Sequence, residues 1–114
     1  MLLNKKEIDY KDGLWLETVF ESSNILKTDY NTTQNKLYVY FNRGQVYSYT
    51  NVSKDLHERF LNAESQGKFF INEIKKNPDK YPFAKEFTIT EGEINELKEN
   101  IEKYKEKLDE KANN

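Results

Sequence analysis

The chain has 114 residues, which is the size of one domain with a single core. Its formal net charge is −2. Cysteine is absent, so disulfides, thiolate nucleophiles and zinc sites that use Cys are excluded. The only histidine, His57, lacks the partners that a His-based metal site needs. We therefore predict no metal and no cofactor. Aromatic residues make up 14% of the chain, which favours a compact fold over a disordered one.

Charge and hydropathy limit the partners of the chain. Residues 1–6 have no apolar segment of the kind found in a secretory signal, and no apolar run approaches the roughly 18 residues of a membrane span. We therefore expect a cytoplasmic protein without membrane contact. Residues 36–80 are mildly basic and residues 91–111 are acidic. This basic excess is well short of the basic stripe of a strong duplex binder.

The N-terminal extension, residues 1–21, is expected to add one strand to the domain. Residues 4–13 are charged and predicted to be irregular, whereas residues 14–20 are apolar and favour a strand. Trp15 lies on the opposite face of this strand from Leu14 and Leu16. It is either a packing residue or a platform on which a ligand stacks.

Two further strands, residues 36–41 and 45–50, form an aromatic hairpin after a short strand at residues 24–30. A three-residue connection that ends at Gly44 requires a positive φ only at that glycine, so we prefer it to a two-residue turn. In that register Tyr47 and Tyr49 share the face of Leu37 and Val39, toward the helices, and are expected to be largely structural. Tyr38 and Tyr40 then lie on the opposite face, which makes them the better candidates for ligand contact. The alternative is that they pack across the strands or are covered by the N-terminal strand or the C-terminal helix.

Helices are predicted after the hairpin. Ser53 is a typical N-cap for a helix that extends to about Glu64, and Ser65 caps a second helix over residues 66–76, which ends before Pro78. His57 is predicted to lie on a solvated helix surface. Residues 84–90 are expected to be a linker.

Residues 91–112 are predicted to form a separate amphipathic helix. Thr90 and Glu93 match a capping box, and apolar residues follow at alternating spacings of three and four. The residues of this heptad seam are Ile94, Leu97, Ile101, Tyr104 and Leu108. The seam is short, so three alternatives remain: the helix docks on its own domain, it frays in solvent, or it drives homo-oligomer formation.

Together these elements predict an α+β fold. It consists of a small antiparallel sheet of three to four strands packed against two short helices, with an additional C-terminal amphipathic helix.

Part of the chain resembles the KTSC domain family, named for its occurrence at the C-terminus of some lysyl-tRNA synthetases. The resemblance covers residues 22–83 and leaves out residues 1–21 and the C-terminal helix. It is carried by Ser22-Ser23-Asn24-Ile25, Leu37-x-Val39-x-Phe41, Gly44-x-Val46-Tyr47-Ser48-Tyr49, Val52-Ser53, Ala63-Glu64-Ser65-Gln66-Gly67-Lys68-Phe69-Phe70 and Ile74. It implies a small α+β module of unknown function for which RNA binding is suggested, and it provides no catalytic residues.

The residues favour a binding module over an enzyme, because no nucleophile has a suitable base beside it. Aromatic side chains stack on bases and basic ones neutralise phosphate, so we expect a nucleotide-type ligand, either single-stranded RNA or a small or cyclic nucleotide. The candidate ligand-binding residues are Tyr38, Tyr40, Arg43, Lys36, Tyr47, Tyr49, Lys54, Ser65 and Lys68. The alternative is a protein-interaction or oligomerisation module that uses the tyrosine face and residues 91–112.

Overall fold

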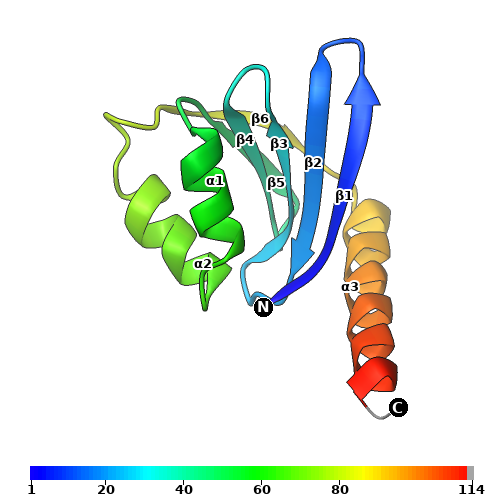
Figure 1. Ribbon diagram of the computed structural model, residues 1–114. Coiled ribbons are helices and arrows are strands. Elements are labelled where there is room, and N and C mark those ends of the chain that lie inside the picture. Colours follow the sequence, from blue (N-terminus) through cyan, green and yellow to red (C-terminus); the bar gives the residue numbers. More distant parts are fainter. Residues whose placement is uncertain (113–114) are drawn as a thin grey trace.

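The computed structural model describes residues 1–112 and confirms the α+β class. Six strands form one antiparallel sheet in the order in which they occur along the chain (Figure 1), so the strand number is higher than the sequence predicts. The strands are β1 Leu2–Tyr10, β2 Gly13–Phe20, β3 Ile25–Asn31, β4 Lys36–Phe41, β5 Gln45–Tyr49 and β6 Phe83–Thr88. The helices are α1 Lys54–Leu61, α2 Gln66–Phe69, the π-helical η1 Phe70–Lys75 and α3 Glu91–Ala112.

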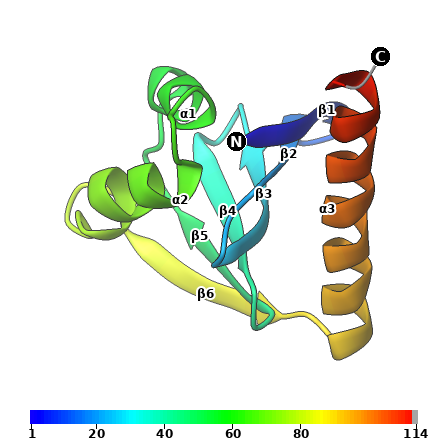
Figure 2. The ribbon, with the colours of Figure 1, turned by 90° about the horizontal axis from the view of Figure 1, so that it is seen from below.

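The curved sheet lies between two helical layers (Figures 1 and 2). Helices α1 and α2 cover one face, called here the inner face, and α3 crosses part of the other, the outer face. Among the described residues, no helix combines the length and the apolar character that a membrane span requires.

The main core lies between the inner face and the helices. Because alternate residues of a strand share a face, Leu37 and Val39 of β4 and Tyr49 of β5 all point toward α1 and η1. Phe60 and Phe70 meet them from the helices, and both are fully buried. Burial of this apolar surface is the main force that holds the helices on the sheet.

A smaller core holds α3 against the outer face. Leu26 and Val46 of the sheet, together with Ile89, pack with the seam residues Ile94, Leu97 and Ile101. At the far end of the helix, the Asn4 side-chain amide donates a hydrogen bond to the Tyr104 hydroxyl at 3.2 Å. In this structure, the heptad seam therefore docks on its own domain.

The hairpin between β4 and β5 confirms the predicted register. Leu37 pairs with Tyr49 and Val39 with Tyr47, and the Gly44 amide donates to the Phe41 carbonyl at 2.9 Å. Gly44 has a φ of +96°, in the region that a residue with a Cβ avoids. The tyrosines of this hairpin therefore divide between the two faces of the sheet.

Two segments at the edges of the sheet differ from their predictions. Residues 4–13, expected to be irregular, form most of β1 and its turn, so the extension adds two strands. Residues 84–90, expected to be a linker, contain most of β6, which pairs with β5. Every β6 side chain is exposed and β1 is largely exposed, so neither shows the hydrophobic alternation by which a strand is recognised.

The predicted solvated position of His57 is wrong, since its side chain is only 1% exposed. The imidazole stacks on the Tyr30 ring at a centroid distance of 4.1 Å and lies 6.0 Å from the Phe60 ring. Both predicted caps are present: the hydroxyls of Ser53 and Ser65 accept hydrogen bonds from the amides of Leu56 and Lys68.

Candidate functional site

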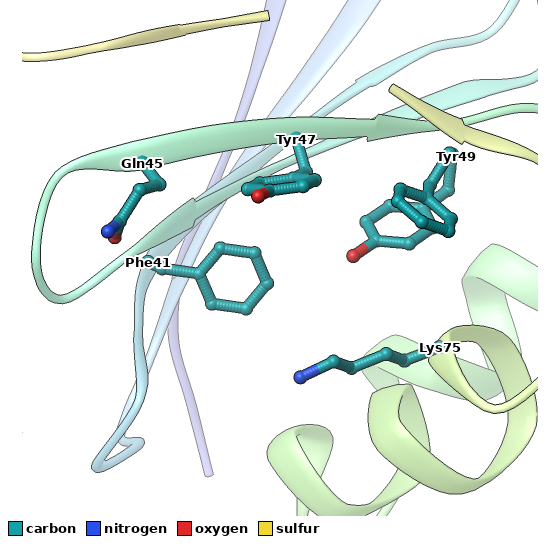
Figure 3. A pocket seen from close by; sticks show the side chains of 6 residues that line it. Phe41, Gln45, Tyr47, Tyr49 and Lys75 are labelled. Carbon is teal, nitrogen blue, oxygen red and sulfur yellow. The ribbon is translucent and has the colours of Figure 1, made fainter. Parts of the chain in front are cut away.

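A cleft lined by aromatic side chains opens at the inner face, between the β5–β6 edge of the sheet and η1 (Figure 3). This aromatic cleft has a volume of about 400 Å³. Its lining residues are Phe41, Gln45, Tyr47, Tyr49, Lys75 and Phe83. They come from three neighbouring strands and from η1, so the cleft exists only in the assembled fold.

The rings of the cleft are held at tilted and edge-on angles. Tyr47 meets Phe41 edge-on at a centroid distance of 5.8 Å and lies 6.2 Å from Phe83. Tyr49 is buried, and its ring meets that of Phe70 edge-on at a centroid distance of 5.1 Å. Burial, with a smaller contribution from Tyr47, raises the pKa of the Tyr49 hydroxyl to about 12, so the hydroxyl stays protonated at a pH that ionises an ordinary tyrosine. Phe83 is 57% exposed and presents its ring at the mouth of the cleft.

A second, more polar hollow lies next to the aromatic cleft, with which it shares Phe41, Gln45 and Lys75. This polar hollow measures about 350 Å³ and adds Arg43 together with the amide side chains of Asn24 and Asn42. Among the described residues, no Asp or Glu lines either space. Together these two adjacent hollows, called here the inner groove, combine ring faces with cationic and amide groups.

Lys75 reaches the cleft from the end of η1. Its ammonium nitrogen lies 5.9 Å from the centre of the Phe41 ring and points toward the same space as the Tyr49 hydroxyl (Figure 3). In η1 the Lys76 amide bonds to the Ile71 carbonyl five residues earlier, at 3.1 Å. Such π-turns change which face of a helix a side chain leaves from, and they are frequent at functional sites.

The outer face carries another aromatic space, beside α3. This outer hollow measures about 560 Å³ and is lined by Tyr10, Lys11, Asp12, Trp15, Asp29, Tyr38, Tyr40 and Phe87. The ring centroids of Trp15 and Tyr38 lie 5.4 Å apart, and the two ring planes are tilted by 42°. Tyr40 meets Phe87 edge-on at 6.1 Å.

Charged side chains lie directly beside the tyrosines of the outer hollow. The Lys27 ammonium lies 3.0 Å from a Glu17 oxygen and 3.2 Å from an Asp29 oxygen. Burial alone would lower the pKa of Lys27, but these two carboxylates outweigh it and raise that pKa. Burial also raises the pKa of Asp29, against the opposing effect of Lys27. Two carboxylates share one ammonium, so the cluster is net negative, which accounts for the raised pKa of Lys27, whereas that of Asp29 is due mainly to burial.

The candidate residues from the sequence do not form one site. Tyr47 and Tyr49 line the aromatic cleft and Arg43 the polar hollow, whereas Tyr38 and Tyr40 line the outer hollow. Lys36 lies beside Tyr38, with its ammonium 5.3 Å from the ring centre and 3.6 Å from a Glu86 oxygen. The remaining three, Lys54, Ser65 and Lys68, lie at the starts of α1 and α2 and line none of these hollows.

Sequence reasoning does not find Phe41, Gln45, Lys75 and Phe83 as residues of the cleft. The hairpin register places Phe41 and Gln45 on the face of Tyr47, which is a usable signal. No such signal exists for Lys75 and Phe83, because the π-turn and β6 are not visible in the sequence pattern. Within residues 1–112, no group of three or more His, Asp or Glu side chains is arranged to hold a metal ion.

Comparison with known families supports the resemblance described above. A family model, the KTSC domain, matches residues 21–78, from just after β2 to just after η1. The match includes Tyr47 and Tyr49 of the aromatic cleft and excludes β1, β2, β6 and α3. A comparison with curated proteins finds no match. Because the family model matches half of its length, the chain belongs to the KTSC domain family.

Proposed function

We propose that the chain is a non-catalytic binding module for short nucleotide-type ligands: small or cyclic nucleotides, or a short stretch of single-stranded RNA. One observation carries the proposal. The aromatic cleft and the polar hollow share Phe41, Gln45 and Lys75, the polar hollow adds Arg43, and no carboxylate is among the lining residues described. Such a ligand needs ring faces for its base and cations for its phosphate, and this groove offers both.

The cleft suits a planar base. Tyr47 is half-buried and Phe83 is exposed, so each ring keeps a face that a base could cover. Stacking of a base on an aromatic side chain is worth roughly 1–3 kcal/mol. The amide of Gln45 has both donor and acceptor atoms and can hydrogen-bond a base edge.

The polar hollow suits a phosphate group. Arg43 offers a fork of N–H donors and Lys75 a mobile ammonium, which together can neutralise a small number of negative charges. The chain as a whole has a net charge of −2, which disfavours long nucleic acids that need many phosphate contacts. This charge balance favours a short ligand. A small nucleotide also fits the cytoplasmic location that the sequence predicts.

A thermal-shift screen with nucleoside monophosphates, cyclic nucleotides and short oligoribonucleotides tests the proposal. A ligand at about 100 times its Kd adds about 2.7 kcal/mol of stability, which raises Tm by about 10 °C in a domain of this size. We expect Tyr47→Leu to weaken binding by roughly tenfold through lost stacking, and Lys75→Gln to weaken it by lost charge. Tyr38→Leu, on the outer face, is the matched control and leaves the Tm shift unchanged.

Two results would contradict the proposal. One is the absence of a Tm shift with every ligand of the panel at millimolar concentration. The other is a shift that Tyr38→Leu reduces as much as Tyr47→Leu does, since those residues lie on opposite faces of the sheet.

A further inference from the structure

The outer hollow gathers aromatic rings that are far apart along the chain. Tyr10 comes from β1, Trp15 from β2, Tyr38 and Tyr40 from β4, and Phe87 from β6. Tyr10 and Phe87 are two of the four exposed large hydrophobic residues in the described part of the chain, at 61% and 48%. Exposed rings that converge on one space are costly to leave uncovered, and they form the kind of surface that ligands use.

The chain itself uses two of these rings to hold cations. The Lys27 ammonium lies 4.7 Å from the centre of the Tyr40 ring, and the Lys36 ammonium lies 5.3 Å from that of Tyr38. Both distances are within the reach of a cation–π contact. The electron-rich faces of these tyrosines are therefore already part of an environment that stabilises positive charge.

The charges around the hollow also favour a cation. Asp12 and Asp29 line it, whereas Lys11 is the one lysine among its described lining residues. Beneath Tyr40, the carboxylates of Glu17 and Asp29 share the single ammonium of Lys27. Lys36 is paired with Glu86 and adds no net charge. The balance is negative, opposite to that of the groove on the inner face.

We propose that the outer hollow is a second ligand site, which binds an organic cation of the methylated-ammonium class. Rings from four strands supply the faces of an aromatic cage, and Asp12 and Asp29 supply the countercharge. A phosphate-bearing ligand is disfavoured there because these carboxylates would repel it. The proposal is independent of nucleotide binding on the inner face, so either can fail alone.

Trp15 provides a direct readout, because it is the only tryptophan of the chain. Its indole N–H donates to Asp12 at 2.9 Å, which fixes the ring at the hollow. We expect choline to change Trp15 fluorescence in a saturable way. The neutral isostere 3,3-dimethyl-1-butanol should bind about tenfold more weakly, since it has the shape but not the charge. A peptide that carries trimethyllysine is tested in parallel. Comparison of its affinity with that of choline shows whether the site prefers a free cation or a methylated lysine of another protein.

Two substitutions in the turn between β1 and β2 are expected to change the choline affinity in opposite directions. Asp12→Asn removes one negative charge but keeps an oxygen that accepts the indole hydrogen bond, so it should weaken choline binding by a few-fold. Lys11→Ala removes the repelling cation and should tighten binding. Glu58→Gln, on the exposed surface of α1, removes the same charge far from the hollow and should leave the affinity unchanged.

The proposal is overturned if choline and its neutral isostere bind equally well, because charge then plays no part. It is also overturned if neither choline nor the trimethyllysine peptide alters Trp15 fluorescence at about 10 mM. A third contradicting result is that Asp12→Asn and Lys11→Ala change the affinity in the same direction.

Discussion

The burial of the His57 imidazole makes the stability of the fold depend on pH. Its ring is stacked on Tyr30, and Nε2 has no hydrogen-bond partner among the described residues. Burial, with a smaller contribution from Lys5, lowers the pKa of His57 from 6.5 to about 4. The folded protein therefore holds the imidazole neutral under conditions in which an unfolded chain would protonate it.

We predict that the free energy of unfolding falls between pH 6.5 and about pH 4 because of this residue. Below pH 6.5 the unfolded state binds a proton that the folded state excludes, until the pH reaches the folded pKa. The lost stability is on the order of 3 kcal/mol. Urea unfolding of the protein and of His57→Leu at pH 7 and pH 4.5 measures it. If the two proteins lose equal stability on acidification, His57 is not the cause.

The buried position of His57 agrees with the spacing of its own helix. Leu56, Phe60 and Leu61 are the buried apolar residues of α1, and His57 lies three residues before Phe60 and four before Leu61, so it shares their face. The ring that covers the imidazole could not be predicted in this way. It belongs to Tyr30 of β3, whose hydroxyl donates a hydrogen bond to the Val52 carbonyl at 2.7 Å. Such a contact joins residues that are distant in sequence, which a local pattern does not encode.

At the scale of elements, the β4–β5 turn is also the place where α3 begins to pack. The Gly44 carbonyl accepts a hydrogen bond from the Ile89 amide at 2.9 Å. A Cβ added at Gly44 would come within 2.8 Å of Cδ1 of Ile94 and 3.1 Å of the Ile89 carbonyl oxygen. Position 44 therefore requires glycine for two reasons: the turn has a positive φ, and the helix approaches the backbone closely.

We expect Gly44→Ala to lower the free energy of unfolding by about 2–4 kcal/mol, as the sum of backbone strain and the clash with Ile94. Ile94→Ala alone should also cost stability through lost packing, but in the double variant the clash is absent while the strain remains, so the loss should be smaller than the sum of the two single losses. Chemical denaturation of the two single variants and the double variant forms the cycle. Strictly additive losses would show that the turn and α3 are not in contact as described.

The elements that could be predicted are those with a buried face. The β4–β5 hairpin alternates between the two sides of the sheet, and its register followed from the chemistry of the turn at Gly44. The capping box of α3 is also present, with the Glu93 amide donating to the Thr90 hydroxyl at 3.2 Å. In contrast, β1 and β6 are edge strands whose exposed side chains carry no periodic signal, so only tertiary pairing reveals them.

At the scale of the whole molecule, the sheet separates two chemically different surfaces. The inner groove presents Arg43 and Lys75 beside aromatic rings, whereas the outer hollow presents Asp12 and Asp29 beside another set of rings. The hairpin register predicted this division of the tyrosines. The register did not predict which charged side chains would lie beside each pair of tyrosines, because Lys75 comes from η1 and Asp12 from the β1–β2 turn.

The docking of α3 maintains this separation. Its seam residues Ile94, Leu97 and Ile101 are packed against the sheet, which leaves its charged side chains toward solvent. An ion pair of 3.4 Å between Lys105 and Glu21 adds a contact near the other end of the helix, but it is exposed and contributes little. The helix thus completes the outer face and leaves the inner groove open.

The central claim is that the inner groove is the nucleotide site, and an amide NMR titration of the full chain with the ligand of largest Tm shift tests it most directly. We predict chemical-shift changes confined to β4–β5 around Phe41–Tyr49, to η1 near Lys75 and to Phe83. The amides of Lys11, Asp12 and α3 should remain unchanged. Changes centred on the outer hollow, or none at saturating ligand, would contradict the assignment.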